Sequence, residues 1–242
     1  MNYKLITSVN HNNICCLTLD NRKKCNALSQ LFFDEFEDFI NILSTNKEVR
    51  CLIIKGKENI FSSGGNLDEI FNADYNQAEF MARRCQAVFQ SLMALEMPTI
   101  AMIDGIAYGG GFELALHCDI RFCSETSVFK FPETKLGLIP ASGGISLFSK
   151  YFSPADSAYY LFSGETIPIN KLIQRGIIQE VKKSDELSDF TFKFAEKLCE
   201  IPKESIATCK KILYSNLFSD LNNNLNMEAL EFSSLLQTCG KK

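Results

Sequence analysis

The sequence contains no tryptophan and only two histidines among its 242 residues. So few histidines leave little choice for a metal ligand or for the base of a serine hydrolase, and Ser62, Ser63 and Ser142 have no evident histidine partner. Ten cysteines are present, but none belongs to a CxxC pair and several lie in apolar runs. We therefore expect small buried side chains in a reducing cytoplasm rather than disulfides or zinc ligands.

Long apolar runs are also missing. No segment approaches the roughly 18 consecutive apolar residues of a membrane helix, and residues 1–6 lack the apolar core of a signal peptide. The net charge of -4 gives no basic surface for nucleic acid. The length of 242 residues suits one α/β domain with a full core, or one domain plus a small appendage, and a hydrophobic fraction of 46% argues against a disordered or membrane chain. The expectation is a cytoplasmic protein that binds neither membranes nor nucleic acid.

The hydrophobic pattern predicts an α/β core over the first three quarters of the chain. One helix is expected after Ser29, whose side chain can cap its N-terminus, and a longer one over about 76–96. Short apolar segments predict strands at about 3–8, 14–19, 51–54, 99–103, 119–123, 128–131 and 177–181.

The last quarter of the chain has a different pattern, because strand signals stop at about residue 186. Three helical stretches are expected there, near 186–200, 203–218 and 220–238. Pro202 and the run Asn222-Asn223-Asn224 are expected to separate them. No internal repeat or low-complexity linker is present. The predicted organisation is a core over 1–185 and a helical C-terminal region over 186–242.

Two glycine-rich loops each follow a predicted strand and precede a helix. The first contains Gly64-Gly65, and the second is Gly109-Gly110-Gly111. Glycines let a backbone approach a ligand closely, and loops at the carboxyl ends of parallel strands lie at one edge of a sheet. Two N–H groups converging from such loops would form an oxyanion hole. The spacing matches neither GxGxxG nor a Walker motif, which argues against a nucleotide phosphate site.

Two glutamates close unusual backbone segments. Glu113 ends the triple-glycine segment, and Glu133 follows an apolar run that is stopped by Pro132. Taken singly, each has a structural explanation, as an acid at a helix N-terminus or as a solvated loop residue. His117, four residues after Glu113, raises a metal site as an alternative, but no other ligands cluster with it. Together with the two loops, the glutamates indicate proton transfer next to a polarised carbonyl.

Four segments, in this order, resemble the crotonase family, which is the enoyl-CoA hydratase/isomerase superfamily, and the likeness covers nearly the whole chain. They are Asn21-Arg22 leading to Asn26-Ala27-Leu28, Phe61 to Leu67, Asp104 to Leu114, and Phe131-Pro132-Glu133 with Leu136 to Pro140. The resemblance implies an α/β fold with a crotonase-like ββα superhelix core and a helical C-terminal trimerisation region. It also implies a homotrimer or a dimer of trimers.

The resemblance further implies a site for an acyl-CoA thioester, with no cofactor other than the coenzyme A of the substrate. It places the oxyanion hole at the N–H groups of Gly65 and Gly110, and the acid/base pair at Glu113 and Glu133. The acyl pocket would involve residues 67–81 and the surroundings of Leu136. Candidate contacts with substrate or coenzyme A are Lys24, Ala27, Ser63, Gly64, Leu67, Gly109 and Leu136.

Retention of both glutamates favours an enoyl-CoA hydratase of fatty-acid metabolism, such as β-oxidation. Alternatives are a Δ3-Δ2 enoyl-CoA isomerase, a carrier-protein-linked dehydratase, and a non-catalytic thioester-binding protein. Three departures from the family pattern concern the coenzyme A side: no proline follows Asn21-Arg22, Asn66 replaces an aspartate, and Asp68 replaces a basic residue. The sequence also stops at Lys242, where many relatives continue. These differences leave acyl carrier protein open as a partner.

Overall fold

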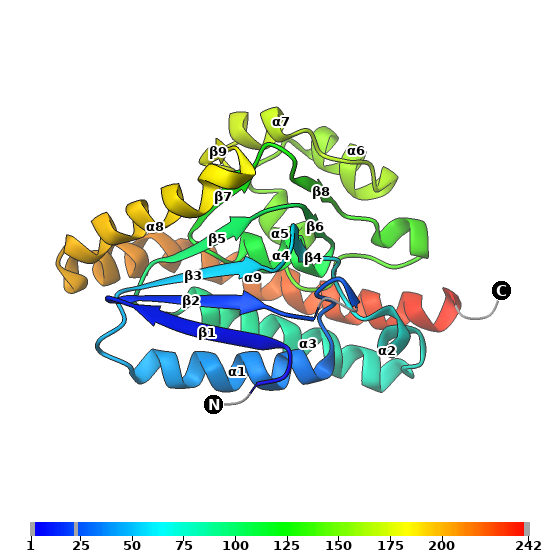
Figure 1. Ribbon diagram of the computed structural model, residues 1–242. Coiled ribbons are helices and arrows are strands. Elements are labelled where there is room, and N and C mark those ends of the chain that lie inside the picture. The colour runs from blue at the N-terminus through cyan, green and yellow to red at the C-terminus, as the bar shows by residue number, and fades with distance from the viewer. Residues whose placement is uncertain (1–2, 22–23, 240–242) are drawn as a thin grey trace.

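The computed structural model describes residues 3–21 and 24–239, except for the side chains of 216–224, 227, 238 and 239. Arg22, part of the first segment of the family resemblance, lies outside the described residues. The chain folds into two sheets surrounded by helices (Figure 1). In spatial order, the larger sheet contains β1 (Ile6–His11), β2 (Ile14–Leu19), β3 (Cys51–Gly56), β5 (Thr99–Ile103), β7 (Ile120–Ser124) and β9 (Glu180–Lys182). The smaller sheet contains β4 (Ile60–Ser62), β6 (Ile106–Tyr108) and β8 (Val128–Lys130).

Parallel pairing dominates both sheets, and only the hairpin of β1 and β2 is antiparallel among the described pairs. The central strands are apolar on both faces, as buried parallel strands require. Every residue of β5 is buried, and so are the first four residues of β3. The expectation of an α/β fold with a crotonase-like core is confirmed.

The ends of the sheet differ from the sequence-based expectation. The first strand begins at Ile6 rather than near residue 3, because the Glu35 carboxylate accepts the N–H groups of Lys4 and Leu5 at 2.7 and 2.9 Å. The last strand is Glu180–Lys182 rather than 177–181. Ile177 is fully buried in the main core instead.

The two helices predicted within the core are present. Helix α1 (Gln30–Thr45) is capped by Ser29, whose side chain accepts the N–H of Phe32, and α3 (Tyr75–Met93) begins with a capping box at Asp74. The shorter helices are α2 (Leu67–Phe71), α4 (Gly110–Leu116), the 3-10 helix η2 (Glu133–Leu136), α5 (Gly144–Phe148), α6 (Pro154–Ser163) and α7 (Ile169–Gln174).

The C-terminal region contains two long helices, α8 (Ser184–Glu200) and α9 (Lys203–Cys239), where three were expected. The run Asn222-Asn223-Asn224 lies inside α9 and does not end it. Each asparagine costs a helix less than about 1 kcal/mol relative to alanine, and packing of α9 along α3 outweighs that cost. In Figure 1, α9 passes behind the strands and reaches the side of the molecule where α2 and α3 lie.

The polar residues outside the glycine loops are mostly structural. Asp119 accepts hydrogen bonds from the Thr99 N–H, the Lys210 ammonium and the Tyr214 hydroxyl at 2.7, 2.7 and 2.9 Å, so its carboxylate serves as a structural acceptor. The cysteines that the structure describes are all free, and most are buried.

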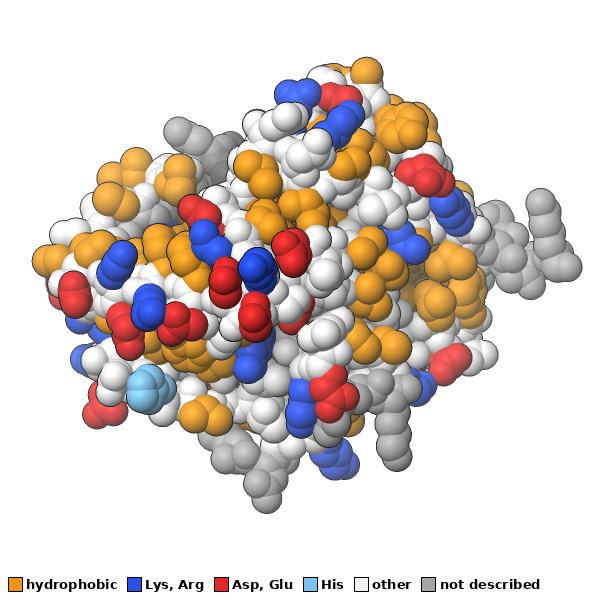
Figure 2. All heavy atoms as spheres, turned by 45° about the horizontal axis from the view of Figure 1, so that its top comes forward, with side chains coloured by type: hydrophobic (Ala, Val, Ile, Leu, Met, Phe, Trp, Pro, Cys, Tyr) orange, Lys and Arg blue, Asp and Glu red, His pale blue; other side chains and the backbone are white. Residues whose placement is uncertain are grey.

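Figure 2 shows positive and negative side chains interspersed on one face. No helix among the described residues is long and apolar enough to span a bilayer.

Candidate active site

The smaller sheet positions the site, because each of its three parallel strands ends at one of the predicted segments. Strand β4 runs into Gly64-Gly65, β6 runs into Gly109-Gly110, and β8 runs into Pro132-Glu133. Parallel strands have their carboxyl ends at the same edge, where ligands of α/β proteins bind. The sequence signals that are separate along the chain therefore meet at one edge of this sheet.

The two glycine loops bring the amides of Gly65 and Gly110 close together. A Cβ atom added to Gly110 would lie 3.4 Å from the nitrogen of Gly65. Neither amide donates a hydrogen bond to another described residue, although Asn66, next to Gly65, donates to the Leu28 carbonyl. Both amides belong to residues that line the same cavity. This pair of free donors has the arrangement required to bind one carbonyl oxygen.

The first loop is held by a buried serine. The Ser62 hydroxyl donates to the Asn26 carbonyl at 2.8 Å and accepts the Gly64 N–H at 3.1 Å. Asn26 itself binds the carbonyls of Ile60 and Phe61 through its side-chain amide at 2.8 and 3.3 Å. The Gly64-Gly65 segment is therefore fixed before any ligand arrives, as a preorganised donor site requires.

Glycine is required at position 109 for two reasons. Its φ angle is +47°, which side-chain-bearing residues rarely adopt, and a Cβ atom there would lie 2.5 Å from Oε1 of Glu133. A substitution would both strain the loop and displace the glutamate. The triple glycine therefore makes room for a carboxylate as well as for a ligand.

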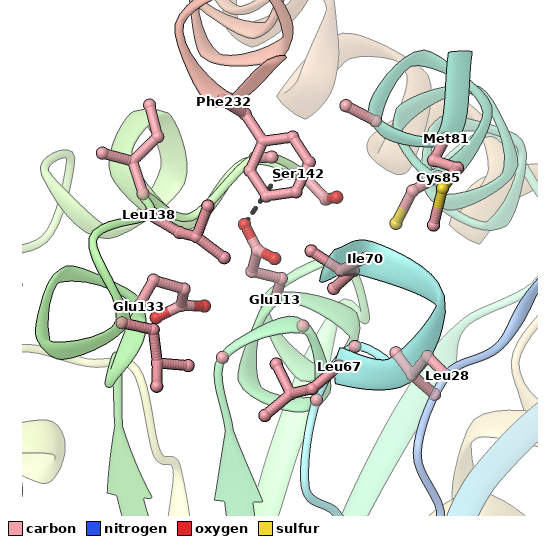
Figure 3. A pocket seen from close by; sticks show the side chains of 18 of the residues that line it. Leu28, Leu67, Ile70, Met81, Cys85, Glu113, Glu133, Leu138, Ser142 and Phe232 are labelled. Carbon is pink, nitrogen blue, oxygen red and sulfur yellow. Dashed lines mark hydrogen bonds between the residues drawn. The ribbon is translucent and has the colours of Figure 1, made fainter. Parts of the chain in front are cut away.

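Glu113 lies in the first turn of α4 and is 3% exposed. Its Oε1 atom accepts the N–H groups of Ser142 and Gly144, both at 2.8 Å. Burial, followed by the nearby carboxylates of Glu133 and Glu228, raises the pKa of Glu113 well above its usual value. The two N–H donors act in the opposite direction, since they stabilise the charged form. Figure 3 shows the carboxylate pointing into the cavity.

Glu133 begins the 3-10 helix η2, and Figure 3 shows its side chain next to that of Glu113. Its Oε2 atom has no contact with solvent and no hydrogen-bond partner among the described residues. Burial raises the pKa of Glu133 to about 8. A carboxyl group with this pKa holds a proton at neutral pH, and its Oε2 atom could still form a hydrogen bond.

The two glutamates and the two amides border one cavity of about 160 Å³. A single water molecule needs only about 10–15 Å³ of such volume. Apolar side chains form most of its wall, and Figure 3 shows several of them facing the glutamates. The labelled apolar side chains are Leu28, Leu67, Ile70, Met81, Cys85, Leu138 and Phe232. Such a chamber suits an apolar chain that ends in one polar group.

Most of the predicted substrate contacts lie in the same lining. These are Ser63, Gly64, Leu67, Gly109 and Leu136. Lys24 and Ala27 lie outside it: the Lys24 ammonium pairs with Asp68 at 2.9 Å on the surface, and Ala27 is buried with its N–H donating to the Lys24 carbonyl. Within the expected stretch 67–81, the lining residues are Leu67, Ile70 and Met81.

Several residues of the site were not found from the sequence. The amides of Ser142 and Gly144, which bind Glu113, were missed, although the pair Gly143-Gly144 before an apolar run was a usable signal. Phe232, on α9, closes the cavity from the C-terminal region. Its position in an apolar stripe of a helix gave no indication of which surface the stripe would cover.

His117 has a structural setting. Its Nδ1 atom lies 2.8 Å from the carbonyl oxygen of Glu113, and its ring packs against Phe89. Burial lowers the pKa of His117 to about 4, so the ring is neutral near pH 7. His117 contacts the backbone of α4 and does not line the cavity.

The comparison with known proteins agrees with this geometry. The model of the enoyl-CoA hydratase/isomerase family matches residues 9–242. The chain is 29% identical over 227 residues to a probable enoyl-CoA hydratase of Bacillus subtilis, covering 93% of this chain and 88% of that protein. It is 33% identical over 198 residues to a carnitinyl-CoA dehydratase of Salmonella enteritidis, covering 81% and 75%.

A solved structure of an enoyl-CoA hydratase subunit from Geobacillus kaustophilus superposes with a TM-score of 0.85 at 26% identity, over 98% of this chain and 90% of that one. The sequence, the fold and the placement of the glutamates and glycine loops all indicate the same family. This chain belongs to the enoyl-CoA hydratase/isomerase family.

Proposed function

We propose that the protein is an enoyl-CoA hydratase, which reversibly adds water to the C2=C3 double bond of a 2-enoyl-CoA and gives a 3-hydroxyacyl-CoA. One observation carries the proposal: two carboxyl groups and two free amide donors border a single apolar cavity. Hydration of an enoyl thioester needs a polarised carbonyl, a base for water and an acid for the α-carbon. This site offers a group for each.

The thioester oxygen would accept hydrogen bonds from the N–H groups of Gly65 and Gly110. Polarisation of the carbonyl draws electrons from the double bond and makes the β-carbon electrophilic. When water adds, negative charge develops on the oxygen as an enolate. Donors fixed in advance stabilise that charge by roughly 3–4 kcal/mol for each hydrogen bond.

The surroundings of the two glutamates suggest a division of their roles. Burial and the nearby carboxylates raise the pKa of Glu113, and the two amide donors counter that rise by favouring its charged form, so we assign Glu113 as the base that takes a proton from water. Glu133, which holds a proton near neutrality, would deliver that proton to the α-carbon. The oxygen of water forms a bond to C3, a proton bonds to C2, and exchange of one proton between the two carboxyl groups and water restores the starting state.

Each step uses groups of the chain and the substrate, so no further cofactor is invoked. A second candidate is the Δ3-Δ2 isomerase, because Glu133 alone could move a proton between the two carbons through its unpartnered oxygen. A dehydratase acting on a carrier-protein thioester is a third candidate, since Lys24, a candidate contact with coenzyme A, pairs with Asp68 on the surface.

The deciding experiment is turnover of a panel of enoyl-CoA thioesters of different length and branching. We expect loss of the absorbance of the conjugated enoyl thioester and formation of the 3-hydroxyacyl product, identified by mass. A shift of the double bond in a 3-enoyl-CoA, without hydration of any 2-enoyl-CoA, would replace the proposal with the isomerase. Turnover only of carrier-protein thioesters would favour the dehydratase, and binding without turnover would leave a thioester-binding protein.

A further inference from the structure

Helix α9 carries a charged residue in the stripe that it packs against the rest of the chain. Glu228 is 4% exposed, and its neighbours along the stripe are the buried residues Leu225, Ala229, Phe232 and Leu236. A buried carboxylate is costly unless it is hydrogen-bonded. Glu228 therefore needs hydrogen-bond donors inside the protein.

Glu228 binds the turn that also orients Glu113. Its Oε2 atom accepts the Gly143 N–H at 2.7 Å, and its Oε1 atom accepts the Ser146 N–H at 2.9 Å and the Ser146 hydroxyl. The neighbouring amides, Ser142 and Gly144, donate to Glu113. Successive amides of one short turn are thus divided between the two glutamates, with 142 and 144 on one and 143 and 146 on the other.

A second contact fixes the same turn to α9. The buried Gln86 side chain, on α3, donates to the carbonyls of Ala141 and Leu225 at 2.6 and 2.7 Å. Ala141 immediately precedes the turn, and Leu225 lies one helical turn before Glu228. The turn also packs closely against the His117 ring: a Cβ atom added to Gly143 would lie only 2.8 Å from Cε1 of His117.

We propose that Glu228 is a positioning residue for the reaction: it holds the turn 142–146 so that the Ser142 and Gly144 amides aim the carboxylate of Glu113 at the bound thioester. This inference rests on the proposed hydratase function and extends it to the C-terminal helix. Replacement of the Glu228 carboxylate by an amide leaves one acceptor oxygen and sets an NH2 group against the other donors of Gly143 and Ser146, so the turn would relax. A displacement of about 1 Å in a reacting group can lower turnover by about 10²-fold.

A purely structural anchor would behave differently. If Glu228 only attached α9 to the core, its loss would lower the free energy of unfolding and leave kcat of the folded enzyme unchanged. If Glu228 positions Glu113, its loss lowers kcat, because the base is then misplaced. KM changes little, because the thioester keeps its ground-state contacts with the Gly65 and Gly110 amides. The ratio between changes in kcat and KM therefore separates the two roles.

The test compares Glu228→Gln with Glu231→Gln, an exposed glutamate on the same helix. For Glu228→Gln we expect kcat for a 2-enoyl-CoA to fall by about 10- to 100-fold with KM changed less than about threefold. Ser146→Ala, which removes only the hydroxyl donor, should give a smaller fall in the same direction and serves if Glu228→Gln does not fold. Folded variants with wild-type kcat would overturn the proposal.

Amide hydrogen exchange provides a readout that needs no turnover. In Glu228→Gln we expect loss of protection at Ser142 and Gly144 as well as at Gly143 and Ser146, with Glu231→Gln like the wild type. Unchanged protection at Ser142 and Gly144 would refute the positioning role. If the wild-type protein hydrates no enoyl-CoA, the proposed function fails, and the exchange data alone decide whether Glu228 fixes the turn.

Discussion

The two sides of the cavity hold their glutamates in opposite ways. On the side of α4, α5 and α9, Glu113 is almost fully buried and bound by two backbone amides, and a further glutamate holds the turn that supplies them. On the side of β8 and η2, Glu133 has one oxygen that no described residue meets, and burial alone raises its pKa to about 8. The Glu113 carboxyl group is therefore restrained by hydrogen bonds, whereas Oε2 of Glu133 has none from the described residues.

The difference shows how one cavity can contain a base and an acid of the same residue type. Burial raises the pKa of both carboxyl groups, but only Glu113 accepts two amides from the turn 142–146, and these favour its ionised form. Two carboxyl groups that share a site also resist holding two charges at once. The environments, rather than the side chains, therefore set the roles proposed for Glu113 and Glu133.

The sharpest way to break this comparison is to neutralise each glutamate in turn. Glu133→Gln and Glu113→Gln should each lower kcat for hydration by about 10²–10⁴-fold, with little change in thioester affinity. Only Glu133→Gln should abolish exchange of the α-protons of a saturated acyl-CoA with deuterated water, because that exchange needs no activated water. Glu165→Gln, at an exposed ion pair with Lys135, is the control. Loss of exchange in Glu113→Gln instead would reverse the assigned roles.

Glycine substitutions can displace one glutamate at a time. A Cβ atom at Gly109 would lie 2.5 Å from Oε1 of Glu133, and one at Gly144 would lie 2.5 Å from Cβ of Pro140 and 2.8 Å from Oε1 of Glu113. We expect Gly109→Ala and Gly144→Ala each to lower kcat by about 10²-fold. Gly109→Ala should also destabilise the fold by about 1–3 kcal/mol, because its φ of +47° is unfavourable for alanine.

Steady-state kinetics and urea unfolding of these two variants provide the measurements. Gly176→Ala is a suitable control for backbone strain alone, since Gly176 also has a positive φ but nothing lies within 4 Å of its added Cβ atom. Wild-type turnover in both site variants would mean that neither glutamate is held where the chemistry needs it.

The smallest expected effect is on stability as a function of pH. The pKa of Glu133 is about 8 in the folded protein, against 4.5 for an ordinary glutamate. Between these values the unfolded chain ionises first, so stability falls as pH rises. Glu133→Gln lacks this effect, and its unfolding free energy relative to wild type should increase by at most about 1.4 kcal/mol per pH unit in that window. Urea unfolding at pH 5, 6 and 7 tests this, and a difference that does not vary with pH would contradict it.

Much of the site follows from local sequence. Each glycine loop and Glu133 comes directly after a short strand, and the rule that carboxyl ends of parallel strands share an edge places them together. The helix after Ser29 and the strand Thr99–Ile103 were also correctly predicted, because caps and apolar runs are local signals. Strands β4 and β6, which directly precede the two glycine loops, were not predicted, and neither was the separate small sheet that they form with β8.

The contribution of the C-terminal region could not be predicted in the same way. The asparagine run suggested a break, but side chains distant in sequence keep α9 continuous. Glu228 lies 85 residues from the amide of Gly143 that it accepts, and no local pattern reports such a contact. An acid within an apolar stripe is a usable signal for a buried acceptor, although it does not name the donor.

The distance along the chain between Glu228 and the turn that it binds has a consequence for biosynthesis. The strands and both glycine loops emerge from the ribosome first, and Glu228 follows Ser146 by 82 residues. At about 5–20 residues per second, roughly 4–16 s separate the two. During that interval the nascent protein has its amide donors but lacks the helix that closes the chamber, so competence for the reaction would arrive only after α9 has been translated.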